Sequence, residues 1–502
     1  MPSPAEILVI CAVALGLVIL VLGLVKLLYV PLAIAFEIRQ GRRQERPTLL
    51  DEQPFVSVVI PGYDEEVVIG NCVRSVLAAS YPRKEIILVD DGSSDGTARL
   101  MADFAAHHDE ISFVSQANGG KGSALNAGRR VARGEVLIFA DADSIFLSET
   151  IEHMLRGFDS PEVGAVCGDD RPVNLDRVLT RLLAYISHVG TGLVRRALSM
   201  LRCLPIVSGN SGAFRREALE RTGLFDTGTV GEDLELTWRM HREGYQVRFA
   251  PRALVYAESP SSLRGLWKQR VRWARGLLQT TGKHRAMIGS PRYGTFGPYL
   301  LFNTLTMIVV PVLQILLLVL LIPLIAVGGA SVPGSVWAWL AWLGVVVAFV
   351  LSVIAIALNR EWSDLRHAWT LPLWPLYSVF VGLTMVVALW KEARDRPATW
   401  DKLERSGVVS RDSSEETIEQ APAPADDDRI GIPAQKGTTS TGDLFSDDFP
   451  VDALLVDERP EPARAERARR RADGPAPAAA RPGRRRGGDA VGLRQDGGSR
   501  AG

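Results

Sequence analysis

The stretch EVLIFADAD, residues 135–143, decides the fold that this sequence is expected to adopt. After Glu135 it is apolar as far as residue 140, as in a buried strand, and Asp141 and Asp143 follow at once. In open parallel α/β sheets, ligands bind beyond the carboxyl ends of the strands. The stretch therefore predicts a strand that delivers two carboxylates to a binding edge.

Similar apolar runs alternate with helical patterns on both sides of this strand. Strands are predicted at 55–61, 85–90, 111–115, 135–140 and 164–168, and helices at 66–79, 95–108 and 122–133. Ser93 or Ser94 is expected to cap the second helix, and Gly134 to close the third. This alternation predicts an α/β domain at 50–260, with a mostly parallel sheet and right-handed crossovers.

Acidic residues follow three of the predicted strands, in PGYDEE (61–66), VDDG (89–92) and DAD (141–143). They are expected to gather at one edge of the sheet, where like charges repel unless a cation joins them. Mg²⁺ or Mn²⁺ prefers oxygen ligands and often binds one or two carboxylates together with substrate phosphates. A lone DxD motif is a weak signal, but its place after a buried strand strengthens it.

The loop GGKGS, residues 119–123, precedes a predicted helix and offers backbone N–H groups and Lys121 to a phosphate. A flexible helix start without a ligand is the alternative. The loop lacks the spacing of a P-loop, which disfavours a nucleoside triphosphatase. No GxGxxG follows the first strand, which disfavours a dinucleotide-dependent oxidoreductase.

Two further motifs, GED at 231–233 and QRVRW at 269–273, lie downstream. Acidic residues in a first helical turn are often mere partners of the helix dipole, so GED alone is ambiguous. In QRVRW, the indole can stack on a sugar ring and an arginine can clamp a diphosphate. The four cysteines and seven histidines show no metal-ligand or redox spacing, so reduced packing cysteines are expected.

The formal net charge is zero, but the charges are segregated, and none occurs between Arg292 and Arg360. Apolar runs of bilayer-spanning length occupy 7–25, 299–326, 336–358 and 370–390. A signal peptide fits the first run poorly, because Glu6 stands where a basic region belongs. The arginines at 39–46 place residue 40 onward in the cytoplasm.

The topology has one conflict, because three later crossings would put the basic residues at 391–396 outside. Either one run, such as 370–390, is re-entrant or interfacial, or a run is miscounted; a cytoplasmic C-terminus is favoured. Residues 261–285 predict a basic amphipathic helix at the membrane surface. The composition of 411–502 predicts a disordered tail, either without a fixed partner or touching anionic lipid.

In their order, the motifs resemble those of the processive family-two glycosyltransferases, which include cellulose, chitin, hyaluronan and poly-β-1,6-N-acetylglucosamine synthases. The motifs that carry the resemblance are PGYDEE, VDDGSSDGT, GGKGSALNAG, DAD, SGNSGAFRR, GED and QRVRW. They cover about residues 50–280, and WDKLERSG (400–407) is similar to the last subgroup. Asp64 and Gly231 stand where the family often has Asn and Thr, and the second departure puts the acceptor-site geometry in question.

The resemblance implies a GT-A type nucleotide-sugar domain that transfers a sugar, N-acetylglucosamine first and glucose next, from a UDP-sugar to a growing β-linked polysaccharide. By position it implies that the uridine is contacted by Pro61, Tyr63, Glu65, Asp90 and Asp91, and that Lys121 contacts the nucleotide. It implies that Asp141 and Asp143 hold Mg²⁺ or Mn²⁺ and the diphosphate, and that catalysis is carried out by Asp233, as general base, and Glu232. It also implies that the acceptor end and the donor diphosphate are seated by Gln269, Arg272 and Trp273. It implies a plasma-membrane enzyme with a cytoplasmic catalytic domain and no nucleic-acid partner, to which accessory export subunits can bind.

The expected organisation is a transmembrane segment at 1–36, the GT-A domain at 50–260, an amphipathic interface helix at 261–290, transmembrane helices at 298–390 and the tail. Two other functions stay open. One is a single-transfer enzyme that makes a lipid-linked sugar, and the other is a membrane protein that binds nucleotide without catalysis. A single-transfer enzyme would give one lipid-linked sugar as product, whereas a polymerase would give a ladder of chain lengths. Release of UDP would distinguish both enzymes from a non-catalytic protein.

Overall fold

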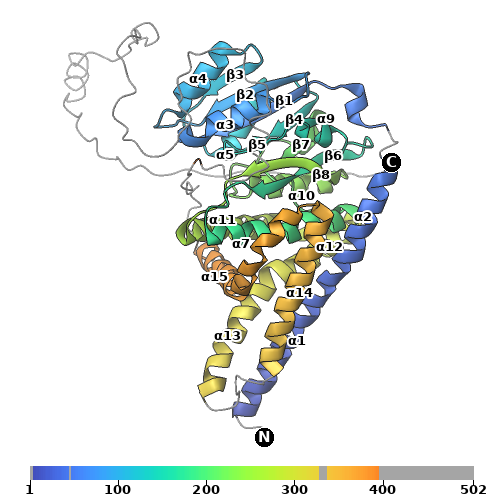
Figure 1. Ribbon diagram of the computed structural model, residues 1–502, viewed down its shortest axis with the longest axis vertical. Coiled ribbons are helices and arrows are strands. Elements are labelled where there is room, and N and C mark those ends of the chain that lie inside the picture. Colours follow the sequence, from blue (N-terminus) through green and yellow to red (C-terminus); the bar gives the residue numbers. More distant parts are fainter. Residues whose placement is uncertain (1–3, 44–46, 327–335, 395–406, 408–502) are drawn as a thin grey trace, which may run out of the picture. The chain divides into compact units, whose positions relative to one another are not determined.

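A computed structural model describes residues 4–43, 47–326, 336–394 and 407, so the predicted tail lies outside the described residues. An eight-stranded sheet forms the core of the α/β part, in the order β3-β2-β1-β4-β7-β6-β8-β5 (Figure 1). The strands are β1 (Val56–Gly62), β2 (Lys84–Asp90), β3 (Ile111–Ser115), β4 (Val136–Phe139), β5 (Ile145–Phe146), β6 (Val163–Pro172), β7 (Gly212–Arg215) and β8 (Gln246–Ala257).

The prediction of an α/β fold with a mostly parallel sheet is confirmed. Strands β1, β2, β3 and β4 pair in parallel, as do β6 and β8. Strand β7 runs antiparallel between β4 and β6, and β5 runs antiparallel to β8. The sequence pattern missed β5 and β7 because two and four residues are too short to show a period, and it missed β8, which Pro251 interrupts.

Helices cover both faces of the sheet, and alternate strand residues serve each face. The helices of the α/β part are α3 (Glu66–Leu77), α4 (Thr97–His107), α5 (Lys121–Val131), α6 (Thr150–Leu155), α7 (Val178–His188), α8 (Arg195–Met200), α9 (Arg216–Thr222) and α10 (Glu232–Arg242). Val58 and Ile60 of β1 pack in the cluster that contains α3, α4 and α6, whereas Val59 packs with α5, α9 and α10. The period-2 pattern of β1 thus fixes which helices lie on which side.

The predicted cap of α4 is wrong. Gly96 holds the N-cap position, and the backbone N–H of Thr97 donates to Asp95 Oδ1 at 2.9 Å. Ser93 lies in the preceding turn, where its hydroxyl oxygen accepts from the Asp64 N–H at 3.0 Å. The serine is therefore used to join this turn to the end of β1.

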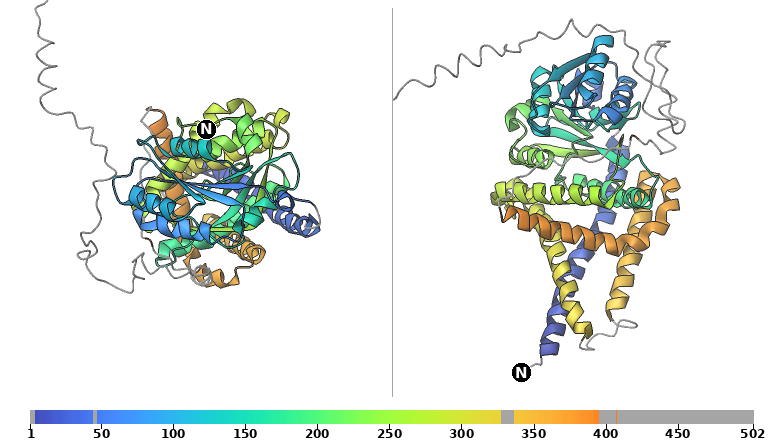
Figure 2. Two further views of the ribbon diagram at one scale, coloured as in Figure 1. Left: turned by 90° about the horizontal axis from the view of Figure 1, so that it is seen from above. Right: turned by 90° about the vertical axis from the view of Figure 1, so that its left-hand side faces the viewer.

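A second group of helices lies mostly below the sheet in the view of Figure 1 (Figures 1 and 2). It comprises α1 (Pro4–Val25), α2 (Tyr29–Arg43), α11 (Leu263–Lys283), α12 (Phe296–Thr304), the π-helix η6 (Leu305–Val309), α13 (Val310–Ala326), α14 (Val336–Asn359), the 3₁₀ segment η7 (Trp362–Leu373) and α15 (Trp374–Glu392). Among the described residues, three stretches are long and apolar enough to cross a membrane: Val9–Gln40, Phe296–Pro323 and Trp362–Glu392. In Figure 2, α1, α13 and α14 extend away from the sheet, while α15 runs across α13.

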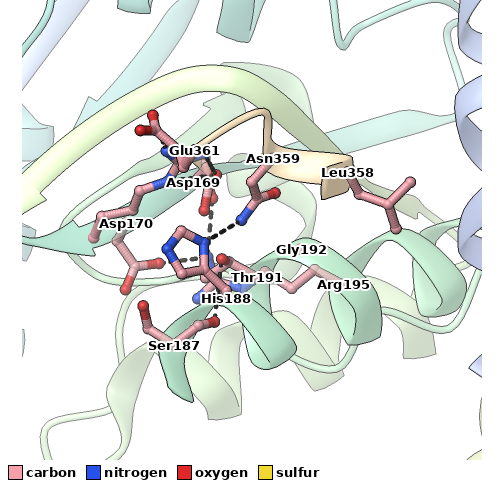
Figure 3. A network of polar contacts seen from close by, with 12 residues as sticks. Asp169, Asp170, Ser187, His188, Thr191, Gly192, Arg195, Leu358, Asn359 and Glu361 are labelled. Atoms are coloured by element: carbon pink, nitrogen blue, oxygen red, sulfur yellow. Dashed lines mark hydrogen bonds and ion pairs between the residues drawn. The ribbon is translucent and has the colours of Figure 1, made fainter. Parts of the chain in front are cut away.

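A buried polar network fastens the end of α14 to α7 (Figure 3). His188 of α7 lies 2.8 Å from Asp364 Oδ2 through Nε2, and Asn359 Nδ2 donates to its Nδ1 at 2.9 Å. Because Nδ1 accepts, the neutral ring carries its proton on Nε2 and donates it to Asp364. The network therefore joins the α/β part to the helix end by directional bonds as well as by apolar contact.

Two buried arginines extend this attachment. Arg196 donates to Glu37 of α2 at 2.5 Å and to Asn359 at 2.8 Å. Arg171 of β6 binds Asp169 at 2.7 Å and Glu361, just after α14, at 2.6 Å. The sheet and the apolar helices are thus held together by ion pairs that water reaches poorly.

We expect Arg171→Met to lower stability strongly, because it removes the guanidinium that binds Asp169, a carboxylate that is fully buried. Removing one partner of a buried ion pair costs about 3–5 kcal/mol. The same substitution at Arg221, whose pair with Glu217 is exposed on both sides, should cost under about 1 kcal/mol. Thermal unfolding of the two purified variants in mild detergent measures the difference; equal midpoints would show that the buried pair does not hold the parts together.

Candidate functional site

Lys121, the first residue of α5, gathers the acidic groups that follow separate strands. Its Nζ lies 2.5 Å from Asp141 Oδ1, just after β4, and 3.7 Å from Glu232 Oε1, at the start of α10. A Cβ placed on Gly209 would lie 2.9 Å from Nζ and 3.5 Å from Asp233 Oδ2. Three segments far apart in the sequence therefore meet around one ammonium group, and Gly209 leaves the room for it.

The charges of this cluster shift one another's protonation. Burial acts to lower the pKa of Lys121, but Asp141, Glu232 and Asp233 outweigh it and raise that pKa above its usual value. Burial raises the pKa of Glu232, and the Asp233 charge adds to this while Lys121 opposes it. With several carboxylates around one fixed cation, the site can accept further positive charge together with an anionic ligand.

The DAD turn offers two carboxylates of different exposure. Asp143 is buried, and its Oδ2 accepts from the Glu258 N–H at 3.2 Å, whereas the Asp141 side chain is 31% exposed. Cys72 lies beneath the turn and donates to the Asp141 carbonyl at 3.4 Å, and burial raises the pKa of its thiol far above the ordinary value. A neutral thiol fits the expected packing role.

The donors present fit a hard divalent cation only with help from a ligand. Within the described part of the chain, no group of three or more His, Cys, Asp or Glu side chains could hold a metal by itself. Asp141 and Asp143 supply carboxylate oxygens at one turn, and Mg²⁺ commonly combines one or two carboxylates with substrate phosphates. These two residues would hold the ion once phosphate oxygens complete its shell.

Asp90 and Asp91, predicted to contact the ligand, have protein partners at the end of β2. Asp91 accepts from the backbone N–H groups of Gly119 and Gly120 at 2.9 and 2.8 Å. Asp90 accepts from the Ser93 N–H at 3.1 Å. Asp91 thus shapes the loop that leads into Lys121, a role that its sequence position did not reveal.

The remaining predicted residues lie at the end of β1 and on α11. Pro61 is in β1, and Tyr63 and Glu65 follow it, with the Glu65 N–H donating to Thr97 Oγ1 at 2.7 Å. Gln269, Arg272 and Trp273 are on α11, and the Arg272 charge acts to lower the pKa of Glu232. The Trp273 side chain is 51% exposed.

Close contact between two glycines sets the distance from α11 to the GED motif. A Cβ on Gly276 would meet the Gly231 Cα at 2.9 Å, and a Cβ on Gly231 would meet Gly276 Cα at 3.0 Å. Gln279 of α11 adds to the joint, because its Oε1 accepts from Thr229 Oγ1 at 3.0 Å. Sequence reasoning missed Gly276 and Gln279, although an isolated glycine in a helical pattern is a signal of close packing.

The α/β part of the chain is similar in sequence to known proteins. Residues 53–276 match the sequence profile of the family described as glycosyltransferase like family 2. The poly-beta-1,6-N-acetyl-D-glucosamine synthases of Staphylococcus epidermidis and Staphylococcus aureus (strain COL) are 36% identical over 225 residues and 33% identical over 243 residues. These matches cover 44% and 48% of the chain and 54% and 58% of the relatives, so the chain spans little more than half of each relative.

One solved structure resembles the fold over much of the chain. It is the mannosyltransferase PcManGT from Pyrobaculum calidifontis in complex with GDP-Man and Mn²⁺, with a TM-score of 0.54 and 23% identity. The match covers 76% of this chain and 100% of that protein. This likeness shows the fold, which is of the GT-A kind.

We expect Gly276→Ala to destabilise the protein, because the added methyl meets backbone atoms of Gly231, which cannot move aside as a flexible side chain can. Gly282→Ala on the same helix is the matched control, since nothing lies within 4 Å of its added Cβ. Alanine favours a helix over glycine by about 0.8–1 kcal/mol, so the control should be neutral or stabilising. Opposite shifts of the thermal midpoint are expected; a stabilised Gly276→Ala would show that the two segments are not in close contact.

Proposed function

We propose that this protein is an inverting membrane glycosyltransferase that extends a β-linked polysaccharide from a UDP-sugar. The match of residues 53–276 to the family described as glycosyltransferase like family 2, together with the GT-A fold, supports this proposal. The observation that carries the proposal is the meeting of Asp141, Glu232 and Asp233 around Lys121. N-acetylglucosamine is the proposed sugar, supported by the names of the relatives.

The arrangement suits a single displacement. The Asp233 carboxylate removes the proton from an acceptor hydroxyl, whose oxygen attacks the anomeric carbon as the bond to UDP breaks. Attack from the face opposite the leaving group turns an α-linked donor into a β-linked product. Lys121 and Arg272 lie where they can stabilise the negative charge that develops on the departing diphosphate.

Asp141 and Asp143 would hold Mg²⁺ or Mn²⁺, which supplies charge neutralisation at the leaving diphosphate. Lys121 then has a second task, because it keeps the acidic cluster balanced when no nucleotide is bound. Glu232, whose pKa burial raises, lies 3.7 Å from Lys121 and adjusts the charge around the base. The uridine is proposed to lie near Pro61, Tyr63, Glu65, Asp90 and Asp91.

The proposed enzyme sits in the plasma membrane with its catalytic domain in the cytoplasm. Helices α1, α13 and α14 extend in one direction from the sheet, as crossing helices would, and α15 runs across α13 (Figure 2). We take α15 as interfacial; three crossings then put the C-terminus in the cytoplasm, the side that the basic residues at 391–396 favour. The growing polysaccharide, the bilayer and accessory export subunits are the proposed partners.

Product analysis tests the function directly. Membranes that contain the full chain are incubated with each UDP-sugar and Mg²⁺ or Mn²⁺, and products are digested with linkage-specific glycosidases. A ladder of chain lengths cut by a β-1,6-specific enzyme is expected from UDP-N-acetylglucosamine. A single lipid-linked sugar as product would show that the enzyme transfers one sugar and does not polymerise. If no donor releases UDP, the proposal that the protein is an enzyme is wrong.

Replacing the proposed base should separate chemistry from binding. We expect Asp233→Asn to lower transfer by at least about 10³-fold, because the amide cannot accept the acceptor's proton. Binding of UDP, measured by calorimetry with Mn²⁺, should stay within a few-fold of the unaltered protein. Glu243→Gln at the exposed end of α10 is the control, and near-normal turnover of Asp233→Asn would remove the assignment.

Metal removal tests the role of Asp141 and Asp143. Thorough chelation is expected to abolish transfer, because the diphosphate loses its neutralising charge, and added Mg²⁺ or Mn²⁺ should restore it. Radiolabelled sugar incorporation before and after chelation measures this. Full activity in the chelated sample would exclude metal assistance.

A further inference from the structure

The guanidinium of Arg270 contacts aromatic rings, whereas that of Arg275 on the same helix binds a carboxylate. Its guanidinium carbon lies 4.2 Å from the centroid of the Trp273 ring and 5.9 Å from that of Tyr377. On the same helix, Arg275 binds Glu392 Oε1 at 2.5 Å, and the Arg272 charge acts on Glu232. In the described part of the chain, no carboxylate pairs with Arg270.

This placement costs free energy that ordinary surface packing does not require. Burial lowers the pKa of Arg270, while the Tyr377 side chain acts to raise it. The Arg270 Nε is shielded from solvent and has no hydrogen-bond partner. A cation held over an indole is stabilised by the ring, more so where water is excluded. Arg270 is therefore ordered by the two rings it touches.

The contact with Arg270 fixes the orientation of the Trp273 ring. Its ring is covered by Arg270 on one side, yet the residue is 51% exposed, so the rest of the indole remains open to a ligand. An indole face packs well on the C–H face of a sugar only if the ring plane is fixed. The guanidinium fixes that plane from behind, which limits the rotamers that Trp273 can adopt.

Tyr377 belongs to α15, outside the family domain of residues 53–276. Helix α15 is held along α11 at two places. The Phe380 ring lies 5.3 Å from the Trp267 ring, and Glu392 binds both Arg275 and Gln279. The Tyr377 ring also lies near that of Trp374, with centroids 5.7 Å apart and planes tilted by 32°. The support behind Trp273 thus rests on a helix about one hundred residues downstream.

We propose that Arg270 and Tyr377 are positioning residues that hold the Trp273 indole for the acceptor sugar, so that α15 completes the acceptor site. The inference rests on the proposed function, because it assigns a purpose to the ring that the acceptor contacts. Neither residue touches the reacting atoms, and both act through Trp273.

The test compares acceptor and donor kinetics of Arg270→Met, Arg270→Lys and Tyr377→Ala, with soluble β-linked N-acetylglucosamine oligosaccharides as acceptor. Arg270→Met and Tyr377→Ala should raise the acceptor KM about tenfold, while the donor KM stays unchanged. Arg270→Lys should recover part of the loss, because an ammonium also binds an indole face. Arg264→Met, at the exposed start of α11, is the matched control. In a Trp273→Phe background, Arg270→Met should add much less than it does alone.

A second readout does not require activity. The difference between the tryptophan fluorescence of a protein and its Trp273→Phe form isolates Trp273, and Arg270→Met should make that signal more accessible to acrylamide. An unchanged acceptor KM, or an unchanged Trp273 signal, overturns the positioning role while transfer by the unaltered protein continues. If the unaltered protein transfers no sugar, the proposed function fails first, and the acceptor role fails with it.

Discussion

One ammonium group among carboxylates holds the proposed active site of this molecule together. Lys121 binds Asp141 directly and lies near Glu232, so the end of β4, the start of α5 and the start of α10 occupy fixed positions relative to one another. Each carboxylate in that space would raise the energy of the others without the lysine. The same balance makes the site receptive to a diphosphate that arrives with a divalent cation, since both charges can be accommodated without leaving a buried ion unpaired.

Around this centre, helix α11 connects two regions with different tasks. The helix meets the GED motif through the contact of Gly231 with Gly276, and it also carries Trp273 and the aromatic contacts to α15. Farther along the sheet, the buried pairs of Arg171 and Arg196 tie β6 and α8 to α14 and α2. Under the proposed function, the acceptor site has to be aligned with the membrane helices, and these two joints would provide such an alignment.

Much of the parallel half of the sheet could be predicted from the sequence, because β1, β2, β3 and β4 are continuous apolar runs bounded by turn residues. The acidic strand ends could be placed at one edge because parallel strands share that edge. The antiparallel strand β7 could not be predicted from the sequence, since GAFR has no readable period. The hydrogen-bond partners of Asp91 could not be predicted either, because they depend on how the loop at 116–120 folds back. The contact of Arg270 with Tyr377 joins segments about one hundred residues apart, and no local pattern reports it.

Gly231 illustrates how a departure from a family pattern can be explained only in three dimensions. In the sequence it puts the acceptor site in question, whereas in the structure a side chain there would meet the backbone of Gly276. The central claim, that one sugar-diphosphate site draws on all these segments, is tested most directly by anomalous X-ray scattering from crystals of the full chain with UDP and Mn²⁺. The account predicts one manganese peak in direct contact with Asp141 or Asp143, with the diphosphate between it and Lys121. A peak elsewhere, or a nucleotide out of reach of Lys121 and Arg272, would contradict it.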